Sequence, residues 1–154
     1  MQLKEELELA QTRQLTDHFN DEDGRRPRLL LASLGETADE RALRLYAAAY
    51  ADAGFDIDVC PLKQSPADTA RMAAENDVHA IGLCGLQAAE LPLVADIHAE
   101  LSKLERADIP CFVRVPAGAE LPACKALAQF PADNHDNYRG EAHHIIEQLS
   151  AYYL

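Results

Sequence analysis

The sequence lacks long apolar runs and positive charge, and each lack excludes a class of protein. No apolar run approaches the ~18 residues that a membrane span needs, and residues 1–6 have no apolar core like that of a secretory signal. The chain has 14 Lys and Arg against 26 Asp and Glu, a formal net charge of -12, so a nucleic-acid backbone would be repelled. We therefore expect a cytoplasmic protein that binds neither membranes nor nucleic acid.

Common catalytic and metal-binding motifs are also missing. No Gly-x-Gly-x-x-Gly, Walker loop or Ser-His-Asp arrangement can be traced. His143 and His144 are adjacent, so on a helix they point ~100° apart, and with His135 they are expected to be solvated rather than metal-bound. No two cysteines form a Cys-x-x-Cys pair, which favours buried thiols over metal ligands. The cysteines are Cys60, Cys84, Cys111 and Cys124.

The composition is that of one globular domain with an extension at its start. A chain of 154 residues, 48% of them hydrophobic, is long enough for one core. Residues 2–18 are charged and helix-forming with a thin apolar stripe, and Asn-Asp-Glu-Asp-Gly at 20–24 breaks that pattern. We expect residues 1–24 to form a helical arm and linker, and residues 25–154 to form an α/β domain.

Short apolar runs alternate with helical patterns through this domain. Strands are expected at 28–34, 55–59, 79–84 and 109–115, with a weaker strand near 127–130. Helices are expected from a Thr37-x-x-Glu40 capping box to Gly54, over 65–75, over 89–104, and around 142–153. The alternation predicts a doubly wound, flavodoxin-like parallel sheet of five strands with helices on both faces.

In such a sheet, ligands bind beyond the carboxyl ends of the strands, where the strand order reverses. A flavodoxin-like order puts that point between the first and third strands, so the loops at Leu34–Glu36 and Cys84–Leu86 are the candidate site. A response-regulator receiver would need a phosphorylatable Asp after its third strand, where Cys84 and Gly85 stand, and that interpretation is set aside.

Three segments carry a family resemblance. Arg28–Glu36 is similar to the first strand and loop of the cobalamin-binding domain of acyl-CoA mutases, and Ala51–Val59 and Ala74–Leu83 are similar to its second and third strand regions. From Arg26 to Val115, the chain resembles the C-terminal, cobalamin-binding domain of the methylmalonyl-CoA mutase family.

The sequence differs from the family at the positions that bind cobalt. Family domains carry Asp-x-His-x-x-Gly after the first strand, and the His ligates cobalt while the Asp orients it. Thr37, Asp39 and Ala42 take those three positions here. A carboxylate is a poor substitute for imidazole on cobalt, and no histidine lies between residues 19 and 78 to replace it. Asp39 and Glu40 are expected instead to favour the start of a helix through its dipole.

Other positions depart from the family as well. Its Ser-x-Leu reads Cys84-Gly85-Leu86, where a buried thiol is favoured over a reactive one because no base is placed beside it. Its Gly-Gly after the fourth strand reads Arg114-Val115, which predicts a filled groove where the family takes the nucleotide tail. Phe130–Asn134 replaces a glycine-rich turn. The expected degenerate site comprises Gly35, Thr37, Asp39, Ala42, Cys84, Leu86 and Arg114.

The resemblance implies a role in a mutase. Bacterial mutases can be heterodimers whose smaller subunit keeps the fold without binding the cofactor. We therefore expect a non-catalytic small subunit or assembly module that takes no cofactor and associates with a mutase-type subunit or with itself. The alternative is a component of a cobalamin-dependent acyl-CoA isomerase that binds the corrinoid without a protein histidine. The chain has no room for the acyl-CoA-binding barrel of full subunits, so it is a fragment or a free-standing paralogue.

Overall fold

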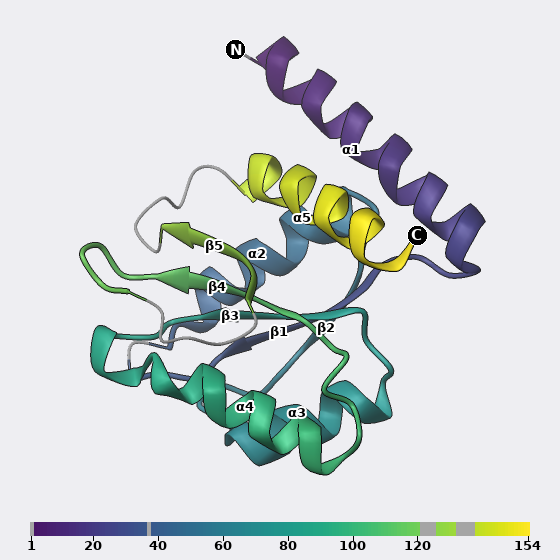
Figure 1. Ribbon diagram of the computed structural model, residues 1–154. Helices are drawn as coiled ribbons and strands as arrows, with labels where there is room; N and C mark the ends of the chain where they lie inside the picture. The colour runs from purple at the N-terminus through teal and green to yellow at the C-terminus, as the bar shows by residue number, and fades with distance from the viewer. Residues whose placement is uncertain (1, 37, 121–125, 132–137) are drawn as a thin grey trace.

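Strands alternate with helices along the chain (Figure 1). The computed structural model describes residues 2–36, 38–120, 126–131 and 138–154. In chain order the elements are α1 (Gln2–Asp23), β1 (Arg28–Ser33), α2 (Glu40–Asp52), β2 (Asp56–Val59), α3 (Pro66–Glu75), β3 (Ala80–Cys84), the short 3-10 helix η1 (Ala88–Glu90), α4 (Pro92–Lys103), β4 (Cys111–Val115), β5 (Ala126–Pro131) and α5 (Tyr138–Tyr153).

The strands form one parallel sheet in the order β2-β1-β3-β4-β5. Because β1 lies between β2 and β3, Leu30 pairs with Asp58 on one side and with Ile81 on the other. α3 and α4 cover one face of the sheet, and α2 and α5 cover the other (Figure 1). The predicted doubly wound, five-stranded fold is confirmed.

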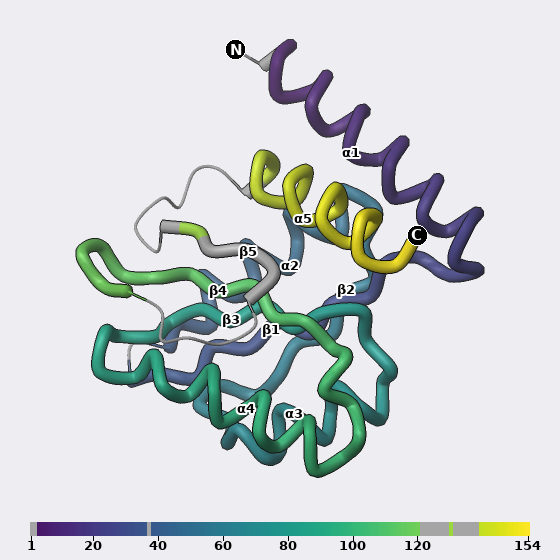
Figure 2. The backbone as a smooth tube through the Cα atoms, in the orientation of Figure 1, coloured from purple at the N-terminus to yellow at the C-terminus, as the bar shows by residue number. Residues whose placement is uncertain are grey.

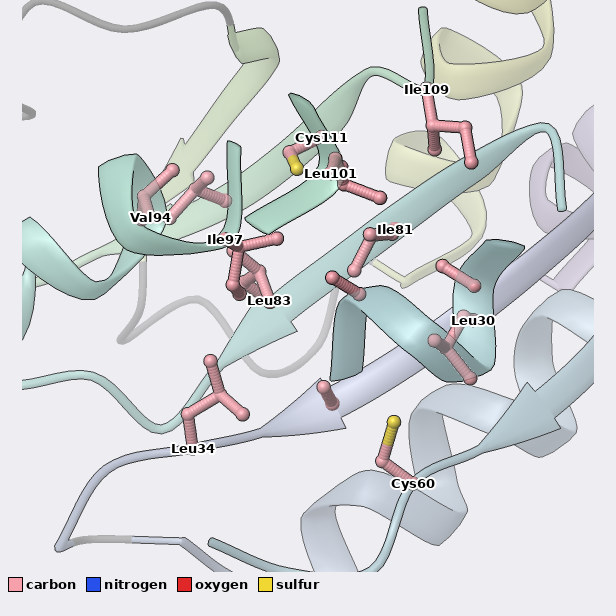
Figure 3. Close-up of a cluster of buried hydrophobic side chains, with 14 of the residues drawn as sticks. Leu30, Leu34, Cys60, Ile81, Leu83, Val94, Ile97, Leu101, Ile109 and Cys111 are labelled. Carbon is pink, nitrogen blue, oxygen red and sulfur yellow. The ribbon is translucent and has the colours of Figure 1, made fainter. Parts of the chain in front are cut away.

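Burial on both faces explains why the strands are continuous apolar runs. Leu30 and Ile81 point toward α3 and α4, where they meet Ile97 and Leu101, and all four are fully buried (Figure 3). Leu29, the neighbour of Leu30 on β1, points to the opposite face and joins the cluster beneath α2 and α5. Alternate residues of one strand thus hold both helical layers in place.

The first helix lies against α5, on the side away from the sheet (Figure 2). Near its end, Phe19 is completely buried, and its ring meets the His79 ring edge-on with centroids 4.9 Å apart. His79 Nδ1 accepts the backbone N–H of Arg28, so Nε2 carries the proton and donates to Asp23 at 2.9 Å. These tertiary contacts explain why α1 continues to Asp23, past the predicted end at residue 18.

Two helix starts differ from their predicted positions. Asp39 is the N-cap of α2, because its carboxylate accepts the backbone N–H of Arg41 at 2.9 Å. The predicted cap, Thr37, lies outside the described residues, as do Cys124 and His135. α4 begins at Pro92, which has no N–H to donate and suits the first helical position. In the described part of the chain, no helix is long and apolar enough to cross a membrane.

The division between residues 1–24 and 25–154 stays a prediction, and Phe19 tests it. Phe19→Ala should lower the free energy of unfolding by about 3–5 kcal/mol, because it empties a fully buried site beside His79 and Tyr153. Leu7→Ala is the control, since Leu7 is 55% exposed on the same helix, and it should change that energy by no more than about 0.5 kcal/mol. Urea denaturation measures both. Equal effects would show that α1 is an appended arm rather than part of the core.

Candidate functional site

The carboxyl ends of β1 and β3 lie side by side, with Ser33 paired to Cys84. The loops that follow them touch. A Cβ atom added to Gly35 would lie 2.1 Å from the carbonyl oxygen of Gly85, and one added to Gly85 would lie 2.4 Å from Ser33 Oγ. Gly85 also has a φ of +69°, which favours glycine. The structure therefore brings together Gly35, Cys84 and Leu86, three of the predicted site residues.

Glu90 fastens these two loops to each other. Its Oε2 accepts the backbone N–H of Glu36 at 3.0 Å, and its Oε1 accepts that of Gln87 at 2.9 Å. One carboxylate thus holds a loop from β1 and a loop from β3. Sequence reasoning did not single out Glu90, although the Gln87-x-x-Glu90 spacing is that of a capping box and indicated part of its role.

Asp39 and Ala42 lie beside this contact, at the start of α2. Asp39 is exposed and caps the helix, and Ala42 is half-buried one turn later. Within the described residues, no group of three or more His, Cys, Asp or Glu side chains could hold a metal ion. His79 does not contribute either, because it precedes β3 at the opposite edge of the sheet.

Cys84 is a protonated thiol at neutral pH. Its Sγ is placed to donate to the carbonyl oxygen of Ala32 at 3.6 Å, and burial raises its pKa to about 11. A reactive cysteine would need a lowered pKa. The favoured interpretation, a buried thiol, agrees with this geometry.

Beneath the loops, a groove runs between the sheet and α2. Leu31, Gly82 and Cys84 line it from the sheet, and Tyr46 lines it from the helix. Its free volume is only about 10 Å³, about the least that a single water molecule needs. Phe112 also fills it, because a Cβ added to Gly82 would lie 2.5 Å from the end of the Phe112 ring.

Arg114 occupies the rest of this groove. Its side chain is 5% exposed, and its guanidinium donates to the carboxylate of Glu141, whose side chain is 4% exposed. The same guanidinium lies 4.1 Å from the centre of the Tyr46 ring. Burial raises the pKa of Glu141 to about 7, although the positive charge of Arg114 opposes that rise.

The pH dependence of stability reports on Glu141. A carboxyl group whose pKa is raised on folding contributes stability that is complete below its unfolded pKa, near 4.5, and is lost as the pH rises through about 7. We expect the free energy of unfolding of wild type, relative to Glu141→Gln, to fall by about 1–3 kcal/mol over that window. Comparing the variant with wild type removes the contribution of His79, which has the opposite sign because burial lowers the pKa of His79.

Urea denaturation at several pH values measures this difference. Glu147→Gln is the matched control on the same helix, since Glu147 is more than half exposed and pairs only loosely with His143, at 3.6 Å. It should change the free energy of unfolding by no more than about 0.5 kcal/mol. A difference between wild type and Glu141→Gln that does not change with pH would contradict the raised pKa.

Known proteins resemble both the sequence and the fold. The chain is 45% identical over 108 residues to the methylmalonyl-CoA mutase large subunit of Propionibacterium freudenreichii subsp. shermanii, covering 70% of this chain and 15% of that protein. It is 40% identical over 147 residues to the large subunit of Streptomyces virginiae, covering 93% of this chain and 20% of that protein. The chain thus spans a fifth or less of these relatives. No family model matches.

A solved structure has the same fold. It is a cobalamin-binding protein from Desulfitobacterium hafniense DCB-2, with a TM-score of 0.57 and 11% sequence identity, covering 91% of this chain and 66% of that one. At that identity the likeness concerns the fold.

These findings correct one expectation and leave others open. The expectation that the chain takes no cofactor is wrong, because its relatives are mutases and its structural neighbour is a cobalamin-binding protein. The resemblance to a small subunit is not confirmed, since the similar proteins named above are large subunits. A degenerate, non-catalytic status is likewise not shown. Over the region that they share, this chain is a homologue of methylmalonyl-CoA mutase large subunits, and its fold resembles that of a cobalamin-binding protein.

Proposed function

We propose that this chain is a cobalamin-binding component of a methylmalonyl-CoA mutase-type isomerase, and that it holds the corrinoid without a protein histidine ligand. The observation that carries the proposal is the meeting of two glycine-containing loops at the carboxyl ends of β1 and β3. Crevices at this point of a doubly wound sheet are ligand sites. The identity of 40–45% to mutase large subunits and the fold shared with a cobalamin-binding protein support cobalamin as the ligand.

The residues present fit the ring of a corrinoid better than they fit its cobalt. Gly35 and Gly85 let the two loops pack against each other, and the loop residues Glu36 and Gln87 are exposed at that edge, where a flat ligand can lie against them. The nearby donors are poor cobalt ligands, because Asp39 offers a hard carboxylate and Cys84 keeps its proton. The exposed residues of these two loops would therefore bind the corrinoid through contacts with its ring, while the buried Gly35 and Leu86 shape the loops.

The whole reaction requires more than this chain. Bound cobalamin supplies the radical chemistry of such an isomerase, and the protein supplies binding and orientation. The shared region is a fifth or less of each relative's length, so we propose that a mutase-type subunit binds the acyl-CoA substrate and packs against this domain.

An absorbance titration with adenosylcobalamin and hydroxocobalamin, followed by gel filtration, tests the proposal. We expect the colour to travel with the protein, because the loops present a surface for the ring. Gly35→Ala should weaken binding about tenfold or more, since its Cβ would collide with the Gly85 carbonyl oxygen. Gly24→Ala is the control for lost stability, because a φ of +91° strains any side chain there. It should leave binding unchanged, since a Cβ at Gly24 meets nothing within 4 Å and the residue lies at the opposite edge of the sheet. A colourless wild-type peak would contradict the proposal.

Glu90→Ala tests whether the order of the loops matters for binding. The amides of Glu36 and Gln87 lose their shared acceptor, so we expect their hydrogen exchange to speed up by about tenfold and cobalamin binding to weaken. Glu100→Ala is the control, because Glu100 only pairs with Lys103 on the surface of α4. Faster exchange without any loss of binding would show that the loops need not be held together.

A further inference from the structure

The groove beneath the loops that follow β1 and β3 has almost no free space. Its floor is Gly82, yet the ring of Phe112 covers that glycine closely. Ligand pockets measure about 300–1,000 Å³, and this groove holds about 10 Å³. A nucleotide-sized group could enter only if side chains left the groove.

Three side chains from three elements keep the groove filled. Arg114 enters from β4, Glu141 pairs with it from α5, and Tyr46 lies under its guanidinium from α2. A lone charge left in this place would be strongly unfavourable, so neither member of the pair can leave without the other. The raised pKa of Glu141 reflects the same burial.

We propose that Arg114, Glu141 and Tyr46 close this groove to the nucleotide tail of cobalamin, so that the chain binds the corrinoid with its own dimethylbenzimidazole still on cobalt. This inference rests on the proposed function. In neutral water the base of cobalamin sits on its cobalt, and a protein removes it by offering the metal another ligand or by offering the base a pocket. The described residues offer no metal-ligating cluster, and the groove between the sheet and α2 has almost no free volume.

The form of bound cobalamin tests the inference. Cobalamin with its base on cobalt is red, and cobalamin with its base released is yellow. We expect the wild-type complex to keep the red spectrum of the free cofactor. Cob(II)alamin carrying isotopically labelled nitrogen in its benzimidazole should keep the coupling of that nitrogen in the electron paramagnetic resonance spectrum. A yellow complex, or loss of that coupling, would overturn the inference while leaving the proposed function intact.

Two double variants test the role of the filled groove. Arg114→Ala with Glu141→Gln removes the pair and opens the groove, so the fraction of bound cobalamin with its base released should rise severalfold. Arg114→Met with Glu141→Gln removes the same charges but keeps the groove filled, and it should behave as wild type. Neither variant leaves a lone buried charge, and circular dichroism checks that both fold.

The remaining outcomes are also decisive. If the opened and the filled variants carry cobalamin in the same form, then Arg114 does not control access to the groove and the inference is overturned. If wild-type protein stays colourless with hydroxocobalamin and adenosylcobalamin, the proposed function fails, and this inference fails with it.

Discussion

The parallel pairing of β1 between β2 and β3 sets the position of the two loops that form the candidate site. From β1 the chain passes to α2 on one face of the sheet, and from β3 it passes to α4 on the other face. The two loops therefore lead to opposite faces of the sheet, and Glu36 and Gln87 are exposed at the edge where the loops begin. Gly35 and Gly85 let the loops touch there, and the carboxylate of Glu90 holds them together.

Below that edge, a buried ion pair determines how deep a ligand can reach. Arg114 lies on β4 in the sheet, and Glu141 lies on α5 in the neighbouring helical layer. Their ion pair contributes little net stability, because removing both charges from water costs free energy. Their main effect is on shape, because the guanidinium fills space between the sheet and Tyr46 that a smaller residue would leave open. The upper edge of the site is thus suited to a flat ligand, while the groove beneath it is closed.

Local patterns predicted most of the fold. The apolar runs of β1, β3 and β4 are buried on both faces, and their alternation with helices allowed the strand order to be predicted. Contacts between distant residues could not be predicted this way. The Arg114–Glu141 pair joins positions 27 residues apart, and the contact of His79 with Asp23 spans 56 residues. The chain has 14 basic and 26 acidic residues, and no sequence rule tells which of these 40 charged residues pair with each other.

The error about the cofactor has a physical origin too. The expectation of no cofactor follows from the missing histidine at Asp39, but a corrinoid offers a large ring for binding as well as a metal. The filled groove at Arg114 was predicted from a bulky residue in a glycine position, and the structure adds the partners that keep it filled.

The most direct test of this account is a map of backbone amide chemical shifts as hydroxocobalamin is added to labelled protein. The account predicts shifts concentrated in residues 34–36 and 84–90, at the ends of β1 and β3, with the signals of Arg114 and Glu141 little changed. Large shifts at Arg114, Tyr46 and Glu141 would show that the tail enters the groove. Shifts confined to the opposite edge around His79, or none at all, would contradict the placement of the site.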